Sequence, residues 1–246
     1  MSGLATFGPE PLQSCPTPWL AVKSWLAGEE GARMAQVRQQ ALVIVAHPDD
    51  ETLWCGGFVL EHASWRWHVV TLCRASDPDR APKFNKVLKY LGATGAMGDL
   101  DDGPGQKPLD LSDLKAVIRQ LAPGEHWHLV LTHGPAGEYT RHHRHEECSR
   151  AVAAMWADGT LRTEALWMFA YEDGGGAYLP RVQDSAECRY ELPEDLWQRK
   201  HRLVTHLYGF SPDSWEARVT PREEGFRPFG SPAEAAVCIS AMEISS

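Results

Sequence analysis

The sequence predicts an α/β protein built on a mostly parallel sheet with helices on both faces. Several short apolar runs are continuous and rich in β-branched residues, which is typical of strands buried on both faces. Helix-length patterns separate these runs, as in repeated βαβ units with right-handed crossovers. The chain has 246 residues, of which 43% are hydrophobic, and this is enough for one large domain with a buried core.

The first expected strand is ALVIVA (41–46), a run without polar residues. The other expected strands are 67–73 (WHVVTLC), 127–133 (WHLVLTH) and 166–171 (LWMFAY), and the expected helices cover roughly 52–64, 81–91, 110–121, 143–157 and 193–208. Ligands of parallel sheets bind beyond the carboxyl ends of the strands. We therefore expect the active site at those ends.

Three regions follow from this pattern. Residues 1–40 form an N-terminal extension with a Pro-rich start, in which residues 18–40 can form a helix. Residues 41–230 form a single domain, and residues 231–246 form a C-terminal tail. The charged, aromatic stretch 214–230 either lines a substrate entrance or mediates an oligomer contact.

Composition narrows the class of partner. The net charge of −9 argues against a nucleic-acid partner, because phosphate binding needs clustered Lys and Arg. The N-terminus lacks a basic start followed by an apolar run, and we expect no membrane span. The six cysteines include no CxxC pair and indicate reduced thiols in a cytoplasmic protein. A homo-oligomer is compatible with the sequence.

A dense polar group follows the first expected strand. His47 and Asp50 are three positions apart and can reach one metal ion from a loop, while Pro48 favours a sharp turn. Zinc accepts nitrogen and carboxylate oxygen, and a catalytic zinc uses three protein ligands plus water. The alternative is a solvated acidic turn, or a helix N-cap at Asp50.

A second polar group follows the expected strand 127–133. His142 and His145 stand three positions apart, a spacing that places both on one face of a helix, and His143 lies between them. The alternative is a polar surface patch at a helix start. Because both groups follow strand ends, we expect them to share one cleft and to supply two histidines and a carboxylate for a hydrolytic metal.

AHPDDE at 46–51 and the later HxxH at 142–145 resemble the PIG-L/LmbE-like de-N-acetylases. That family includes N-acetylglucosaminyl-phosphatidylinositol de-N-acetylase and the deacetylases of mycothiol and bacillithiol synthesis. The resemblance covers roughly residues 41–210. It implies a Rossmann-like fold and one zinc ion (another divalent metal is possible), with His47, Asp50 and His145 as ligands.

The resemblance also implies roles for the neighbouring residues. Asp49 would be the general base, His142 the electrostatic stabiliser or acid, and Tyr139 a hydrogen-bond donor to the oxyanion. Substrate contacts would come from Arg80 and Asp102. The neighbours Arg74 and Asp101 remain competing candidates for those two contacts.

These observations predict a zinc-dependent hydrolase that removes an N-acetyl or other acyl group from a sugar or sugar conjugate. The substrate would be a small N-acylated molecule. Two alternatives stay open: a zinc amidohydrolase acting on a non-sugar amide, and a metal-binding module without turnover. A nucleotide-binding protein is disfavoured because no GxGxxG follows the first expected strand.

Overall fold

The computed structural model describes residues 39–103, 105, 107–140 and 142–244, so the extension predicted at 1–40 and its helix lie almost wholly outside the described part. Within these residues the main sheet has seven strands in the order β3-β2-β1-β4-β5-β9-β8. Strands β1 to β5 run parallel, whereas β9 runs antiparallel to both β5 and β8. The predicted mostly parallel α/β fold is confirmed.

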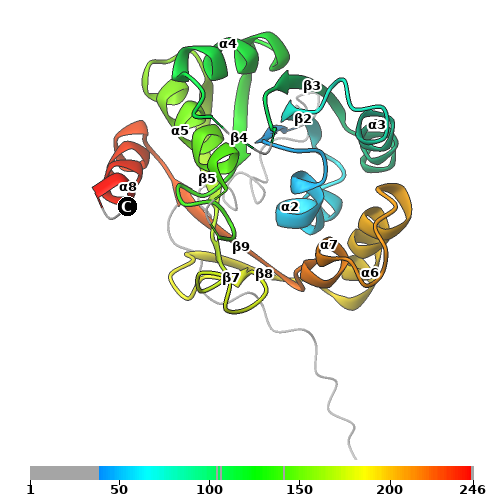
Figure 1. The fold of residues 1–246 in the computed structure, drawn as a ribbon. Helices are drawn as coiled ribbons and strands as arrows, with labels where there is room; N and C mark the ends of the chain where they lie inside the picture. The colour runs from blue at the N-terminus through cyan, green and yellow to red at the C-terminus, as the bar shows by residue number, and fades with distance from the viewer. Residues whose placement is uncertain (1–38, 104, 106, 141, 245–246) are drawn as a thin grey trace, which may run out of the picture.

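The strands alternate with helices through most of the chain (Figure 1). The strands are β1 (Gln40–Val45), β2 (Arg66–Cys73), β3 (Thr94–Leu100), β4 (His126–Thr132), β5 (Arg162–Phe169), β8 (Cys188–Glu191) and β9 (Glu223–Phe229), with a separate pair β6 (Tyr171–Glu172) and β7 (Arg181–Val182). The helices are α2 (Asp50–Glu61), α3 (Arg80–Leu91), α4 (Leu111–Leu121), α5 (His143–Ala157), α6 (Glu194–Arg202), the π-helical turn η1 (Leu203–Leu207), α7 (Trp215–Val219) and α8 (Pro232–Ile244).

Alternation along β1 divides the core between the two faces of the sheet. Val43 and Val45 join the cluster that packs under α2, α3 and α6, and Leu42 and Ile44 join the cluster under α4 and α5. Figure 1 shows these two groups of helices on opposite sides of the sheet. Because both faces are covered, residues 41–45 of β1 are fully buried, which explains their unbroken apolar sequence.

The strand order places a binding crevice at one position. The chain runs from β1 outward to β2 and β3, then returns to the other side of β1 as β4 and β5. The connections after β1 and β4 therefore diverge to opposite faces, and a crevice opens beyond the carboxyl ends of these two strands. The group that starts at His47 follows β1, and the group at 142–145 follows β4 along the chain, so both polar groups meet there.

Strands β3, β7, β8 and β9 lie where no strand was predicted, and the local sequence explains this for β3 and β9. β3 contains Gly95 and Gly98, where an added Cβ would stand 2.5 Å from Val69 O and 2.7 Å from Leu72 O. Glycine is therefore required by the close approach of β2, and it removes the apolar pattern that marks a strand. β9 carries Pro228 and lies within the stretch 214–230, so this stretch is partly a sheet strand.

Residues 232–244 form a helix that packs on the domain. This segment, assigned to a tail in the sequence analysis, is α8, which packs against α5 and buries Ala235. The domain limits at 41–230 stay a prediction. The five cysteines of the described residues are free, and none of the described helices is long and apolar enough to cross a membrane.

Candidate metal and catalytic centre

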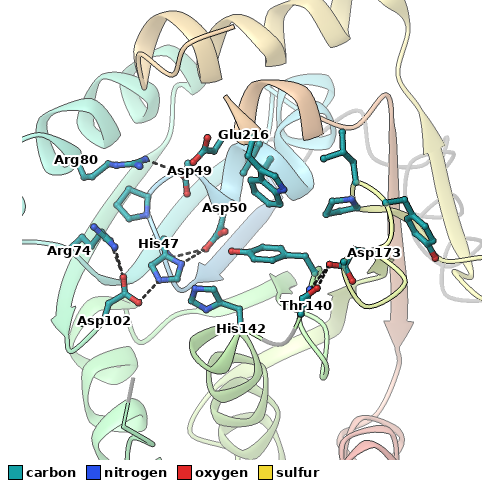
Figure 2. Close-up of a pocket in the computed structure, with 18 residues that line it drawn as sticks. His47, Asp49, Asp50, Arg74, Arg80, Asp102, Thr140, His142, Asp173 and Glu216 are labelled. Carbon is teal, nitrogen blue, oxygen red and sulfur yellow. Dashed lines mark hydrogen bonds and ion pairs between the residues drawn. The ribbon is translucent and has the colours of Figure 1, made fainter. Parts of the chain in front are cut away.

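A cavity of about 560 Å³ opens at the carboxyl ends of β1 and β4, where the sequence predicts the site (Figure 2). All the predicted site residues except the deeply buried His145 line it. They are His47, Asp49, Asp50, Arg80, Asp102, Tyr139 and His142. His145 lies behind this wall with no exposed surface, and Arg74 also lines the cavity.

Three atoms of His47, Asp50 and His145 form a nearly equilateral triangle. Asp50 Oδ2 lies 3.2 Å from His47 Nδ1 and 3.4 Å from His145 Nε2, and the two nitrogens are 3.3 Å apart. Tetrahedral ligands at 2.0–2.1 Å from a zinc ion are separated by about 3.3–3.4 Å. The donor set and its spacing therefore fit zinc.

Carboxylates hold the outward nitrogens of both histidines. His145 Nδ1 lies 2.6 Å from Glu138 Oε2, and His47 Nε2 lies 3.1 Å from Asp102 Oδ1. A carboxylate on one ring nitrogen keeps the proton there and leaves the lone pair of the other nitrogen facing the metal. This arrangement gives both histidines the tautomer that a metal ligand needs.

His133 belongs to the support of the centre. The Ala46 amide donates to His133 Nε2 at 2.9 Å, which occupies the lone pair of that nitrogen. His133 Nδ1 therefore carries the proton and donates it to Glu138 Oε2 at 2.8 Å. Among the residues that the structure describes, two groups that share His145 could hold a metal: His47 with His142 and His145, and Asp50 with His133 and His145. The occupied nitrogen of His133 disfavours the second group.

Glu138 is the residue of this centre to which the sequence reasoning gave no role. It is fully buried, and its other oxygen accepts the Gly134 amide at 2.8 Å. Burial alone would raise the pKa of Glu138, but the attraction of His133 and His145 lowers this pKa to about 2. The one feature of the sequence that could have indicated this role is the position of Glu138 between His133, at a strand end, and the HxxH at 142–145.

Replacing Glu138 by glutamine should weaken zinc binding about 10- to 100-fold. The carboxylate accepts from three N–H donors, whereas an amide turns its NH₂ toward either the histidines or Gly134. Competition with a chromophoric chelator measures the affinity. Glu147→Gln is the matched control, because Glu147, on α5, is also a buried acid but binds Arg144 and the Leu109 amide. Equal affinities in the two variants would refute the role of Glu138.

Asp49 sits beside the triangle in a strained backbone conformation. Its φ of 125° lies in a region that residues other than glycine rarely adopt, at a cost of about 1–3 kcal/mol. The Asp49 amide donates to Glu51 Oε2 at 3.0 Å, and Glu51 Oε1 accepts from the Tyr208 hydroxyl at 2.7 Å. Buried hydrogen bonds thus hold the backbone of Asp49 in this conformation.

The surroundings of Asp49 favour a proton acceptor near neutral pH. Burial and the charge of Asp50 raise the pKa of Asp49 to about 7, against the opposing effect of Arg80. Arg80 Nη1 donates to Asp49 Oδ2 at 2.9 Å, and the Arg80 guanidinium lies 4.5 Å from the centre of the Phe210 ring. Arg80 therefore orients Asp49, and its contact with substrate stays a prediction.

His142 and Tyr139 both face the centre. The His142 ring stacks on His145 at 4.4 Å, and its Nδ1 is buried with no hydrogen-bond partner among the described residues. Burial and the charges of His145 and His47 lower the pKa of His142 to about 3, so its ring is neutral. Burial and the Asp50 charge raise the pKa of Tyr139, which keeps its hydroxyl protonated and able to donate. His143 is exposed.

Asp102 bridges the centre and Arg74. Its Oδ2 accepts from Arg74 Nη2 at 2.6 Å, while its Oδ1 faces His47. Arg74 has a φ of 70°, which directs the chain sharply after β2. Asp102 thus orients His47 as well as lining the cavity, and its predicted contact with substrate stays a prediction. Asp101 uses its backbone carbonyl to bind Arg144.

The rest of the cavity wall comes from segments far along the chain. Trp215 and Glu216 from α7 and residues 176 and 178–180 from the loop after β6 line it. Two roles were considered for the stretch 214–230, a substrate entrance and an oligomer contact. The position of Trp215 and Glu216 on the cavity wall supports the first role for the start of this stretch. The loop is tied to the centre by Asp173, whose Oδ2 accepts from the Thr140 amide at 2.7 Å and the Thr140 hydroxyl at 2.5 Å.

Comparison with known proteins gives a family model and relatives that this chain resembles. The family model described as PIG-L: GlcNAc-PI de-N-acetylase matches residues 42–156. An uncharacterized protein of Acanthamoeba polyphaga mimivirus is 26% identical over 186 residues, which cover 70% of this chain and 79% of that protein. The predicted resemblance to the PIG-L/LmbE-like proteins is confirmed.

Solved structures share the fold. N,N'-diacetylchitobiose deacetylase from Pyrococcus horikoshii matches with a TM-score of 0.56 and 16% identity, covering 89% of this chain and 95% of that chain. A zinc-inhibited form of a teicoplanin deacetylase matches with a TM-score of 0.53 and 14% identity, covering 77% and 97%. The 4-carboxy-2-hydroxymuconate hydratase GalB from Pseudomonas putida also matches, with a TM-score of 0.53 and 17% identity, covering 77% and 95%. These likenesses show the fold alone.

Proposed function

We propose that the chain is a zinc-dependent hydrolase that removes an N-acetyl group from a sugar-containing substrate, and the match of the PIG-L family model to residues 42–156 supports this. The observation that carries the proposal is the ligand triangle of His47, Asp50 and His145, with the strained Asp49 beside it. A site that only stored metal would not need Asp49, which is outside the triangle and lines the open cavity.

The proposed reaction is amide hydrolysis by water. The metal, when bound, would supply a Lewis acid that polarises the amide carbonyl and lowers the pKa of a water molecule. Asp49 accepts the proton of the attacking water, held in place by Arg80. The neutral His142 ring and the Tyr139 hydroxyl stabilise the developing oxyanion. The leaving amine takes its proton from Asp49, which received that proton from the attacking water.

Release of acetate and a primary amine in equal amounts tests the proposal. The full chain is incubated with N-acetylglucosamine conjugates and with non-sugar N-acetyl amides, with and without a zinc chelator. We expect chelator-sensitive release from the sugar compounds. Release from only the non-sugar amides would move the function to another amidohydrolase, and absence of release from every amide would refute it. An assay for hydration of a conjugated acid is included, since the hydratase GalB shares the fold.

Tyr208→Phe should lower kcat roughly 10-fold with little change in KM, because it frees the Glu51 carboxylate that holds the Asp49 amide. Tyr171→Phe is the matched control. Tyr171 is equally buried and donates to the same helix, at Trp54 O, without touching Glu51. Each variant should lose about 1 kcal/mol of unfolding free energy. Equal kcat values in the two variants would show that the Tyr208 hydroxyl is only structural.

A further inference from the structure

The two sides of the active-site cavity differ in chemistry. Figure 2 shows Arg74, Arg80 and Asp102 on one side, and Thr140 and Asp173 on the other. The first side is ionic, and its arginines pair with Asp102 and Asp49. The second side continues outward as an apolar wall made of Tyr139, Trp215, Tyr178, Leu179 and Pro180. The cavity therefore suits a molecule with a polar half and an apolar half.

The apolar wall is exposed where it reaches the cavity mouth. Trp215, Tyr178 and Leu179 are 37%, 38% and 36% exposed. They make up half of the six large hydrophobic side chains that are exposed among the described residues, and all three line this one cavity. Single exposed hydrophobic residues are ordinary, but a group of them beside a cavity indicates a binding surface.

Trp215 is held in place by aromatic contacts. Its ring meets Tyr139 at 4.8 Å between ring centres, and Trp54 lies 6.5 Å away. Tyr139 in turn meets His145 at 5.4 Å, so aromatic rings run without a break from the metal centre to the mouth. The Ser214 hydroxyl accepts the Ala217 amide at 3.2 Å and fixes the start of α7.

Tyr178 is held by its own loop. Residues 174–176 are glycines with φ of 62°, 71° and 85°, a conformation that favours glycine. A Cβ on Gly174 would stand 2.5 Å from the Tyr178 ring, so the ring rests directly on the loop backbone. The Tyr178 hydroxyl donates to Glu172 at 2.8 Å, and the Arg181 guanidinium lies 4.3 Å from the ring centre. An ordered wall binds an apolar group with little loss of side-chain entropy.

We propose that the substrate carries an apolar, ring-sized group that binds between Trp215 and the Tyr178–Pro180 segment while the amide lies at the metal centre. This inference rests on the proposed deacetylase function and adds the chemical class of the substrate to it. The apolar group can belong to the amine half, as an aglycone, or to the acyl half. Both sources present the same chemistry to the wall.

Matched ligand pairs test the proposal without turnover. Dissociation constants are measured by calorimetry for the phenyl and methyl β-glycosides of N-acetylglucosamine, and for N-benzoyl and N-acetyl glucosamine, with chelated protein. We expect the ring-bearing member of at least one pair to bind about 10-fold more tightly. Preference in the first pair assigns the group to the amine half, and preference in the second assigns it to the acyl half. Equal affinities in both pairs overturn the proposal.

Variants test whether the preference for the ring-bearing ligand comes from the apolar wall. Trp215→Ala and Leu179→Ser should each bring the ratio of the two dissociation constants in the preferred pair towards 1. Tyr90→Ala and Leu111→Ser should leave this ratio unchanged. Tyr90 and Leu111 are exposed hydrophobic residues of α3 and α4 that do not line the cavity. A preference that survives both wall variants would overturn the proposal. A wall-dependent preference in a protein that hydrolyses none of these amides would leave the wall intact and refute the deacetylase function instead.

Discussion

Replacing Asp49 by asparagine is expected to leave the zinc content unchanged and to lower kcat roughly 10²- to 10⁴-fold. Asp49 lies outside the ligand triangle, and asparagine has nearly its shape but cannot accept the proton of the attacking water. Asparagine also tolerates positive φ better than most residues, so the backbone at 125° is retained. The measurement is amine release at saturating substrate together with elemental analysis.

The control for this variant is Asp158→Asn. It removes one partner of an ion pair, with Lys115 at 2.8 Å, as the Asp49 change does with Arg80. Asp158 lies at the end of α5 and outside the cavity. Its kcat should match that of the parent chain. Activity of Asp49→Asn near the parent value would show that another group takes the proton.

Replacing His145 by alanine should remove the metal and, with it, the activity. His145 supplies one corner of the triangle, and loss of one of three protein ligands should weaken zinc binding by at least about 100-fold. The change also removes one of the buried partners of Glu138 and one of those of Asp50, which lowers the unfolding free energy. His145→Gln, which keeps a polar side chain, separates metal loss from unfolding.

His143→Ala is the control for this prediction. Both residues belong to the three-histidine cluster at the start of α5, but His143 is exposed whereas His145 is fully buried. Elemental analysis should find the parent metal content in His143→Ala and almost none in the two His145 variants. Full metal content in a folded His145→Gln protein would contradict the proposed ligand set.

The strand ends were predictable because buried parallel strands leave a clear pattern. The run 41–46 is apolar without interruption, and it becomes β1 followed directly by His47. The spacing of His142 and His145 also predicted that both rings lie on one side, since residues three or four positions apart at the start of a helix face the same way. These local patterns located the centre.

Contacts between distant segments left no such pattern. Glu51 and Tyr208 are 157 positions apart, and nothing in either local sequence indicates that they meet. Trp215 also reaches the cavity through tertiary packing, on the short helix α7. Strand β3 was missed because Gly95 and Gly98, which the close approach of β2 requires, remove its apolar pattern. Strand β9 was missed because Pro228 has a low strand propensity, which tertiary packing overrides.

The metal content of the active protein tests the central claim most directly. The full chain is stripped with a chelator, and zinc is then added back in steps while bound metal and amine release from an N-acetylated sugar are followed together. The account predicts that amine release is absent from the stripped protein and rises in proportion to zinc up to one ion per chain. Full release from the stripped protein, or zinc bound at one ion per chain without any release, would contradict it.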